Sequence, residues 1–508
     1  MLRLPASVLL IALFASSTRA QETHEHGIPE QLGAVSFPTS CSATVQPEFD
    51  RAVALLHSFA YSAAEKSFRD VADKDPQCAM AHWGIAMTYF HQLWDPPIAT
   101  QKMESGHQEM ERAREIGGGS QRERGFISAL ALMYATDPEL TYEARLGRYT
   151  EAMQKVASTN PQDLESQVFY ALALLASAPP SDKTHTYQKR AVAVLQPLYA
   201  QHPQHPGLAH YMIHACDNAE MAREGLPAAE AYAKIAPSAP HALHMPSHIF
   251  TRLGMWDESI KSNLASQAAA RQQGETGEEL HAMDYLVYAY LQKGEDREAA
   301  GVIQQVKAMP DLNRGDFKIG YAVTAMPVRY TVERQQWAEA AAIDLLPATA
   351  APHVAAIAVW ARGLGLARAG DTVDARAQGA TLQQLEDDLH KLGREYWAGQ
   401  VDIQRLELLA WAAQAEGKSD DAIRMLRQAA DTEDGVEKLP VTPGPIVPAR
   451  EQLGDLLLQL KQPQMALKEF QTSLQNAPGR RGALAGAERA SRLADVAAKS
   501  KDSTNSGR

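Results

Sequence analysis

One pattern recurs in three consecutive segments of the chain: HPGLAHYMIHACD (205–217), APHALHMPSHIFTRLGMWDES (239–259) and ELHAMDYLVYAYLQKGED (279–296). His210 and His214 recur 34 residues later as His244 and His248. After a further 40 residues, the positions of His241, His244 and His248 are taken by His281, Asp284 and Tyr288. Such periods indicate helical hairpins that stack, with equivalent positions of neighbouring repeats side by side. The sequence therefore predicts an all-α solenoid with a histidine-rich patch on one face.

The bulk composition agrees with a repeat array. The 508 residues are too many for one compact hydrophobic core, so the chain must form several domains or a repeat. Aromatic residues make up only 7% of the chain, which favours close-packed helices over sheets. The formal net charge is −12 and the basic residues are dispersed, so the basic stripe of a nucleic-acid-binding protein is absent from the sequence.

A second pattern connects the two ends of the chain. Residues 47–76 and 449–478 both have apolar residues at helical spacing, and they share an alanine, a phenylalanine and a proline at equal intervals: Ala64, Phe68 and Pro76, then Ala466, Phe470 and Pro478. Leu453, Gly454 and Leu457 extend the match. The small residue allows two helices to approach, the ring fills the space between them, and the proline ends the second helix.

These residues resemble the tetratricopeptide repeat (TPR) family, and the resemblance covers most of 45–490. It implies a TPR-like helical-hairpin solenoid wound into a right-handed superhelix, in which the first helix of each repeat lines a concave groove. The groove-facing positions would include His210, His214, His244, His248, Asp284 and Tyr288. The string HALHMPSHIFTRLGMW (241–256), with HYMIHACD (210–217) before it, also resembles a group of largely uncharacterised bacterial exported TPR proteins.

The order of segments along the chain predicts an exported protein. Residues 1–20 have the short positive start and apolar run of a cleaved signal peptide, which implies a periplasmic or secreted location. No later stretch is apolar enough to span a membrane. The remaining boundaries expected are an extended lead-in (21–44), the solenoid (45–435), a proline-rich link (436–448), a last repeat with a capping helix (449–497) and a disordered tail (498–508). The sequence is compatible both with a link that fills the groove and with one that leaves it open.

Three cysteines, Cys41, Cys78 and Cys216, allow one disulfide in an oxidising compartment. Cys41 and Cys78 flank the first helical hairpin and are the better candidates, although sequence alone does not settle the pairing. Cys216 would then be a small apolar residue packed between helices.

The histidine patch holds eight of the seventeen histidines within residues 202–281. Residues four apart share a helix face, so His210 and His214 point together and Asp217 lies one turn further on. His244 and His248 would do the same if a helix has begun by 244. Pro246 argues against this, because proline is tolerated in a first turn and not in mid-helix.

The patch has three competing interpretations. In the first, it binds Zn, Cu, Ni or Fe through His210, His214, His244 and His248, with His241, His281, Asp217 and Asp284 as further groups. In the second, it binds a protein, peptide or small ligand in the groove, with Arg252, Tyr211 and Tyr288 contributing. In the third, the histidines only bond backbone groups and neighbouring helices.

The sequence favours a binding scaffold over an enzyme. It contains no HExxH zinc motif, no GxSxG nucleophile motif and no cofactor fingerprint. The alternative function is a metal-dependent hydrolase or redox enzyme, in which Asp217 or Asp284 beside the histidines would serve as acid or base.

Overall fold

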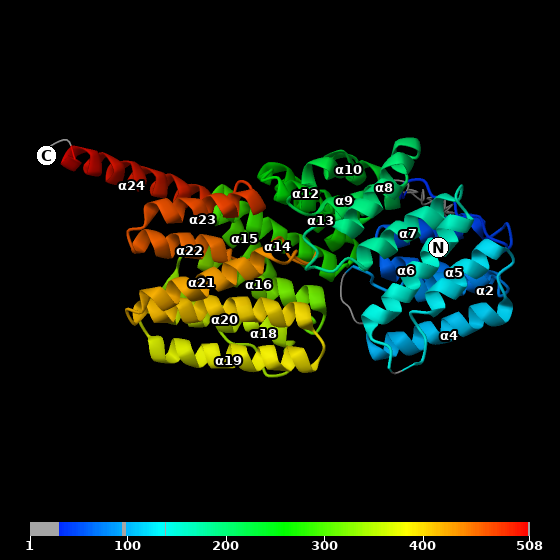
Figure 1. The fold of residues 1–508 in the computed structure, drawn as a ribbon. Coiled ribbons are helices and arrows are strands. Elements are labelled where there is room, and N and C mark those ends of the chain that lie inside the picture. Colours follow the sequence, from blue (N-terminus) through cyan, green and yellow to red (C-terminus); the bar gives the residue numbers. More distant parts are fainter. Residues whose placement is uncertain (1–29, 94–97, 138, 506–508) are drawn as a thin grey trace, which may run out of the picture.

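A computed structural model describes residues 30–93, 98–137 and 139–505, with side chains up to residue 496. Over these ranges the chain forms α-helices and no β-strand, and successive helices pack as hairpins. The predicted all-α, TPR-like solenoid is therefore correct. Figure 1 shows two stacks of helices, an N-terminal stack in blue and cyan and a C-terminal stack in yellow to red, joined by green helices. No helix among the described residues is both long and apolar enough to cross a membrane.

The N-terminal stack consists of eight helices within the described residues: α1 (Gln46–His57), α2 (Tyr61–Lys74), α3 (Ala79–Met87), α4 (Thr100–Ile116), α5 (Gln121–Ala131), α6 (Tyr142–Thr159), α7 (Leu164–Ala176) and α8 (Thr186–Gln201). Ser120 and Glu123 form a capping box at the start of α5, and Thr141 and Asp163 cap α6 and α7. Side-chain oxygens at these positions satisfy backbone N–H groups that the first helical turn leaves free.

The green helices carry the histidine patch, and the later ones lie beside the C-terminal stack in Figure 1. They are α9 (Pro206–Cys216), α10 (Ala222–Ile235), α11 (Pro240–His244), α12 (Pro246–Arg252), α13 (Trp256–Gln273), α14 (Thr276–Lys293), α15 (Asp296–Lys307) and α16 (Phe317–Glu333). The starts of α9 and α11 lie 34 residues apart, which agrees with the repeat period read from the sequence. Gly274 and Gly294 end α13 and α14 with positive φ angles of 73° and 78°, which glycine adopts without steric cost.

The C-terminal stack completes the chain. Its helices are α17 (Trp337–Ala341), α18 (Pro352–Ala369), α19 (Thr372–Lys391), α20 (Glu395–Ala415), α21 (Ser419–Asp434), α22 (Ala449–Gln459), α23 (Pro463–Asn476) and α24 (Arg481–Asn505). The backbone of α24 continues past 498, where the sequence suggested a disordered tail. No proline or glycine occurs between Ala487 and Asn505 to end the helix.

The packing of Phe68 and Phe470 shows how the repeated aromatic and small residues hold neighbouring helices together. Phe68 is fully buried against Gly84 of the next helix, where a Cβ atom would lie 2.3 Å from the ring. Phe470 fits in the same way between Gly454 and Gly486, where Cβ atoms would lie 2.7 and 2.4 Å from its ring. Each aromatic ring therefore occupies space that only a small residue on the facing helix leaves open.

The described part of the lead-in is extended and packed onto the N-terminal stack. Phe37 is fully buried among the rings of Phe49, Trp83 and Phe126, at centroid distances of 5.2–5.5 Å. A disulfide joins Cys41 to Cys78 beside this cluster. The predicted signal peptide (1–20) and the start of the lead-in lie outside the described residues.

Residues 435–448 form no helix and run through the interior of the molecule. Val441, Thr442 and Ile446 are buried, and the backbone N–H of Glu437 donates to Pro180 O in the loop between α7 and α8. The link therefore contacts the N-terminal stack as well as the helices around the histidine patch. Next to that patch, Lys438 of the link donates to Asp217, and the carbonyls of Pro440 and Thr442 accept from Tyr285.

Candidate metal centre

Helix α9 places the first two histidines of the patch. His205 caps this helix by accepting a hydrogen bond from the backbone N–H of Leu208, and Pro206 occupies the first turn, where its missing N–H costs nothing. His210 and His214 follow at a spacing of four and share one face. Their Nε2 atoms lie 3.0 Å apart.

Pro246 divides the second repeat into two short helices without separating its histidines. Helix α11 ends at His244 and α12 begins at Pro246, so the expected interruption is present. The backbone N–H of Met245 still donates to His241 O at 2.9 Å, and the chain keeps its helical direction. His244 and His248 therefore meet across the junction, with their Nε2 atoms also 3.0 Å apart.

The third repeat adds one histidine, and the six side chains form two sets of three. The ligand nitrogens of His244, His248 and His281 all lie within 4.8 Å of one another. The same holds for the second set, which comprises His210, His214 and His241. The sets are neighbours: the ring centroids of His214 and His248 are 6.0 Å apart, as are those of His241 and His244. The four histidines predicted to form one ligand group, His210, His214, His244 and His248, are thus divided between two sets.

Oxygen acceptors hold the Nδ1 atoms of two members of the first set, His244 and His248. His248 Nδ1 lies 2.8 Å from Asp217 Oδ2, and His244 Nδ1 lies 2.6 Å from Asn263 Oδ1. The Asn263 amide nitrogen donates to Ser259 O at 2.8 Å, which assigns the amide oxygen to His244. Both histidines thus donate from Nδ1, and their Nε2 atoms carry lone pairs. Metal-binding histidines are commonly oriented in this way by a second partner on the far nitrogen.

Asp217 is the carboxylate that joins this set to two basic side chains. It accepts from His248 and from Lys438 Nζ, both at 2.8 Å, while Arg252 Nε donates to its other oxygen at 2.8 Å. Burial would raise the pKa of Asp217, but the nearby charges of Lys438 and Arg252 outweigh it, and the pKa lies well below the usual value. Asp217 is therefore an ionised acceptor.

Burial keeps the histidines neutral. His210, His244 and His248 have no exposed surface, and desolvation lowers the pKa of His248 to about 4 despite the opposing effect of Asp217. The pKa values of His210, His214 and His244 are well below 6.5, first because of burial and then because neighbouring histidines repel a second charge. The pKa of His281 is also well below 6.5, because of burial and then because of the charge of Lys318. Neutral imidazole is the form that binds a metal ion.

A second cluster of the same residue types is a closed hydrogen-bond network. His57 Nε2 and His205 Nε2 bind the two oxygens of Glu165 at 2.8 and 3.0 Å. His57 Nδ1 lies 2.9 Å from the Tyr211 hydroxyl, and His205 Nδ1 accepts from a backbone N–H. All four ring nitrogens are used, and the pKa of Glu165 is lowered because both histidines outweigh its burial. This cluster is structural.

Three residues predicted for the patch have partners elsewhere or in the link. Asp284 lies 3.5 Å from Arg329, and the pKa of this carboxyl is raised by burial. The Tyr288 hydroxyl accepts from Arg480 at 3.2 Å. Arg252 contacts Asp217 and also Glu437 of the link, at 3.3 Å. Asp217 and Arg252 therefore belong to the surroundings of the histidines, whereas Asp284 and Tyr288 do not.

Sequence reasoning missed several groups around the histidines: Phe59, Asn263, Glu278, Tyr285 and Lys438. Only Asn263 has a recognisable signal, since buried Ser259, Asn263 and Ser266 form a polar stripe at helical spacing on α13. The Tyr285 hydroxyl lies 3.4 Å from His248 Nε2 and 3.2 Å from the carbonyls of Pro440 and Thr442. It connects the centre to the link.

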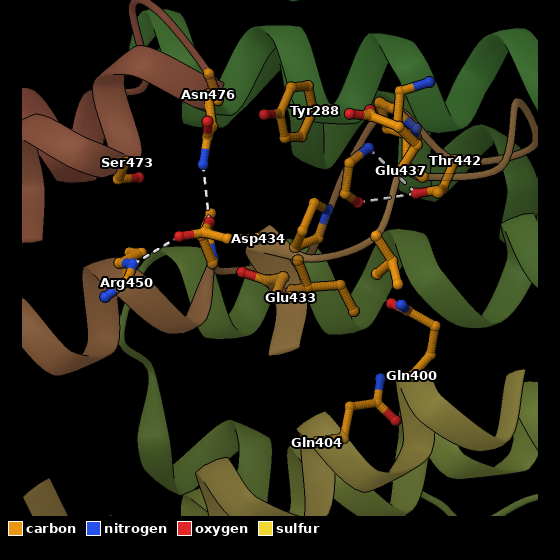
Figure 2. Close-up of a pocket in the computed structure, with 18 of the residues that line it drawn as sticks. Tyr288, Gln400, Gln404, Glu433, Asp434, Glu437, Thr442, Arg450, Ser473 and Asn476 are labelled. Atoms are coloured by element: carbon orange, nitrogen blue, oxygen red, sulfur yellow. Dashed lines mark hydrogen bonds and ion pairs between the residues drawn. The ribbon is translucent and has the colours of Figure 1, made fainter. Parts of the chain in front are cut away.

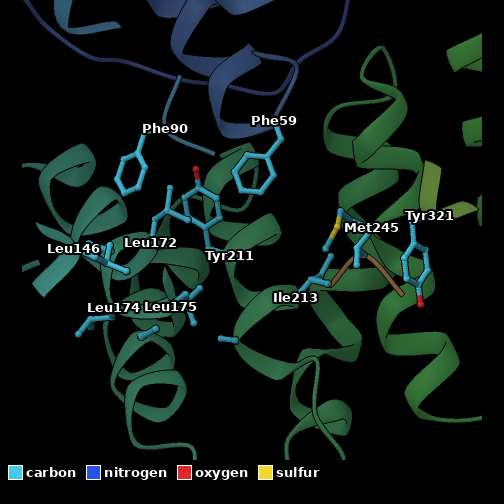
Figure 3. Packing of buried hydrophobic residues seen from close by; sticks show 14 of the residues in the cluster. Phe59, Phe90, Leu146, Leu172, Leu174, Leu175, Tyr211, Ile213, Met245 and Tyr321 are labelled. Carbon is cyan, nitrogen blue, oxygen red and sulfur yellow. The ribbon is translucent and has the colours of Figure 1, made fainter. Parts of the chain in front are cut away.

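Two cavities adjoin this region. One, of about 720 Å³, is lined by Phe59, Tyr61, His241 and Glu278 among others. Phe59 extends from the loop after α1 towards Tyr211 of α9, and the two ring centroids are 6.2 Å apart (Figure 3).

The other cavity, of about 160 Å³, lies beyond the link. Figure 2 shows Tyr288 of α14 facing Gln400 and Gln404 of α20 across this space. The lining combines residues of the link with Thr251 and Arg252 of α12.

The chain was compared with known proteins at the level of families, sequences and structures. No protein-family model matches it, and no curated protein sequence does. The crystal structure of the P58(IPK) TPR domain is similar over 90% of this chain and 99% of its own, with 13% identity and a TM-score of 0.23. The human IFIT1 dimer with m7Gppp-AAAA is similar over 87% and 88%, with 12% identity and a TM-score of 0.39. At these scores neither likeness carries information on function.

Proposed function

We propose that this protein is an exported, TPR-like metal-binding protein that holds a first-row transition-metal ion on His244, His248 and His281. Imidazole suits Zn, Cu, Ni and Fe, and three histidines with a fourth position open is an established ligand set for zinc. The export part of the proposal rests on the signal-peptide pattern of residues 1–20.

The contact between His244 and His248 carries the proposal. Both rings donate from Nδ1 to oxygen acceptors, so two acceptor nitrogens face each other at 3.0 Å. Two lone pairs at this distance repel unless a cation lies between them. A proton is a poor candidate, because an imidazolium in this fully buried site would have lost its hydration. A metal ion satisfies both nitrogens, and the imidazole ligands replace the water molecules that it loses on burial.

The spacing also suits a common metal ion. Metal–nitrogen bonds of about 2.0–2.1 Å and tetrahedral angles place two ligand nitrogens about 3.3 Å apart. The observed 3.0 Å therefore requires only a small adjustment of the rings on metal binding. His281 supplies the third nitrogen, and its ring centroid is 4.3 Å from that of His244.

A ligand in the groove is the second candidate at this patch, because His241 lines the cavity of about 720 Å³. On the side of Asp217, residues of the link are packed against the patch, and Lys438 donates to Asp217. A partner peptide on that side would first have to displace this segment. Binding of an ion inside the solenoid requires no such displacement.

Elemental mass spectrometry of the tag-free protein, purified without chelator, tests the proposal. We expect about one or more equivalents of Zn, Cu, Ni or Fe per chain, and a loss of about one equivalent in His248→Ala and in His281→Ala. His390→Ala is the matched control, since this histidine is exposed and pairs only locally with Glu395. A chain that takes up no stoichiometric metal, even after incubation with each ion, would contradict the proposal.

A further inference from the structure

The other three histidines form a site of their own. His210, His214 and His241 share no member with the first set, and their ligand nitrogens also lie within 4.8 Å of one another. We propose that they hold a second transition-metal ion, next to the first and open to the cavity of about 720 Å³. This inference rests on the proposed function of the first set.

The rings of this set are oriented by fixed acceptors. His210 Nδ1 donates to the backbone carbonyl of His57 at 2.6 Å, which leaves a lone pair on His210 Nε2. His57 is itself held by Glu165 and Tyr211. The closed network of His57, Glu165 and His205 thus gives His210 a rigid support, of the kind that orients metal ligands from outside.

His241 is oriented by Glu278. His241 Nδ1 lies 3.1 Å from Glu278 Oε2, and Lys318 forms an ion pair with the same carboxylate. The pattern repeats that of the first set, where His248 contacts Asp217 and Asp217 contacts Lys438. In both sets a buried histidine, a carboxylate and a lysine form a chain leading away from the centre.

His214 distinguishes the second set from the first. Without metal, its Nε2–H can donate to the lone pair of His210 Nε2 at 3.0 Å, so this pair is satisfied as it stands. On metal binding, that hydrogen must move to His214 Nδ1, and no proton is lost overall. The second ion therefore displaces an existing hydrogen bond, and we infer that it binds more weakly than the first.

The second set is also the more accessible one. His241 and Phe59 line the large cavity, and the Phe59 ring covers His210, His214 and His241 at centroid distances of 4.4, 5.7 and 5.4 Å. Phe59 has a φ angle of 53°, a strained value for a residue with a side chain. Three histidines leave one position of a four-coordinate ion for a small oxygen or nitrogen donor, which would enter past this ring.

Metal stoichiometry tests the second site. Metal-free full chain is loaded with Zn²⁺, freed of excess ion and measured by elemental mass spectrometry. We expect about two equivalents in the native protein, about one in His214→Ala and about one in His281→Ala, with stepwise binding in calorimetry. His241→Gln is a second variant of the same set, and circular dichroism confirms that each variant is helical.

Three other outcomes have distinct meanings. One equivalent that persists in His214→Ala and is lost in His281→Ala would overturn the second site and leave the proposed function standing. One equivalent lost in both variants would mean a single ion shared by all six rings, which also overturns the second site. No bound ion in the native protein would overturn both proposals together.

Discussion

At the residue scale, His57 and His248 show how identical side chains in similar surroundings acquire different roles. Both are fully buried beside an ionised carboxylate. His57 Nδ1 lies 2.9 Å from the Tyr211 hydroxyl, whereas His248 Nε2 faces His244 Nε2 at 3.0 Å and has the Tyr285 hydroxyl only at 3.4 Å, where that hydroxyl also lies 3.2 Å from two carbonyls. Counting donors and acceptors therefore separates the structural histidine from the candidate ligand, where burial and proximity to acid do not.

The pH dependence of stability is a prediction at this scale. The pKa of His248 falls from 6.5 in the unfolded chain to about 4 in the metal-free folded protein. At His248 the unfolded state binds more protons between these values, so the contribution of His248 to stability is fully present above about pH 6.5 and declines as the pH falls towards 4. His248 alone contributes on the order of 3 kcal/mol to this decline.

Urea denaturation of the metal-free protein at about pH 7, 5.5 and 4.5 measures this effect. The slope should be shallower in His248→Gln, which lacks the titrating ring. Equal slopes in the native chain and in His248→Gln would contradict the neutral, buried state of His248. The comparison with this variant is necessary because buried carboxyls of raised pKa, such as Glu433 at about 8, change stability in the opposite direction within the same pH window.

At the element scale, the helix pairs depend on a small residue facing an aromatic ring. Phe68 of α2 packs on Gly84 of α3, and the same relation joins α22, α23 and α24 around Phe470. The link 436–448 is different, because its partners are single side chains on distant helices. Helix packing thus sets the solenoid, and individual polar contacts place the link inside it.

Replacing Gly84 by alanine tests the helix packing. The new Cβ would lie 2.3 Å from the Phe68 ring, so α2 and α3 must move apart. We expect Gly84→Ala to lower the free energy of unfolding by about 1–3 kcal/mol. Gly301→Ala is the control: it lies in α15 with nothing within 4 Å of its Cβ, and should raise stability by about 0.5–1 kcal/mol. Urea denaturation measures the free energy of unfolding of both variants. Equal changes in the two variants would contradict the close packing of Phe68 on Gly84.

At the scale of the whole molecule, the last helix and the link both contact earlier parts of the chain. Helix α24 packs against α14, far away in sequence, and the link connects the loop before α8 to the helices of the metal centre. Arg480, fully buried at the start of α24, forms ion pairs with Glu333 of α16 and Glu451 of α22. The C-terminal stack is thereby fixed to the middle of the solenoid.

Removal of Arg480 tests this contact. Arg480→Ala leaves Glu333 and Glu451 buried without their cation, so we expect a loss of about 3–5 kcal/mol in unfolding free energy. Arg492→Ala removes an exposed arginine from α24, the helix that begins directly after Arg480, and should change stability by less than about 1 kcal/mol. Thermal or urea unfolding measures the stability of both variants. A similar small effect of the two substitutions would show that Arg480 does not stabilise the contact between the C-terminal stack and the middle of the solenoid.

The sequence by itself determined the helices, the stacking and the two histidine pairs. These features depend on periods of four residues within a helix and 34–40 residues between repeats, and Phe68 with Phe470 marks the packing that such periods produce. Local spacing is sufficient because a helix face and a repeat contact are set by neighbours in the chain.

Only the tertiary structure decided the grouping of the six histidines and their partners. His57, Asn263 and Lys438 approach the centre from three separate parts of the chain, and no sequence interval relates them. Their positions depend on the curvature accumulated over many helix pairs and on the return of residues 436–448 through the interior. Small differences in each packing angle add along a solenoid, so contacts between distant repeats follow from the whole fold and not from any local pattern.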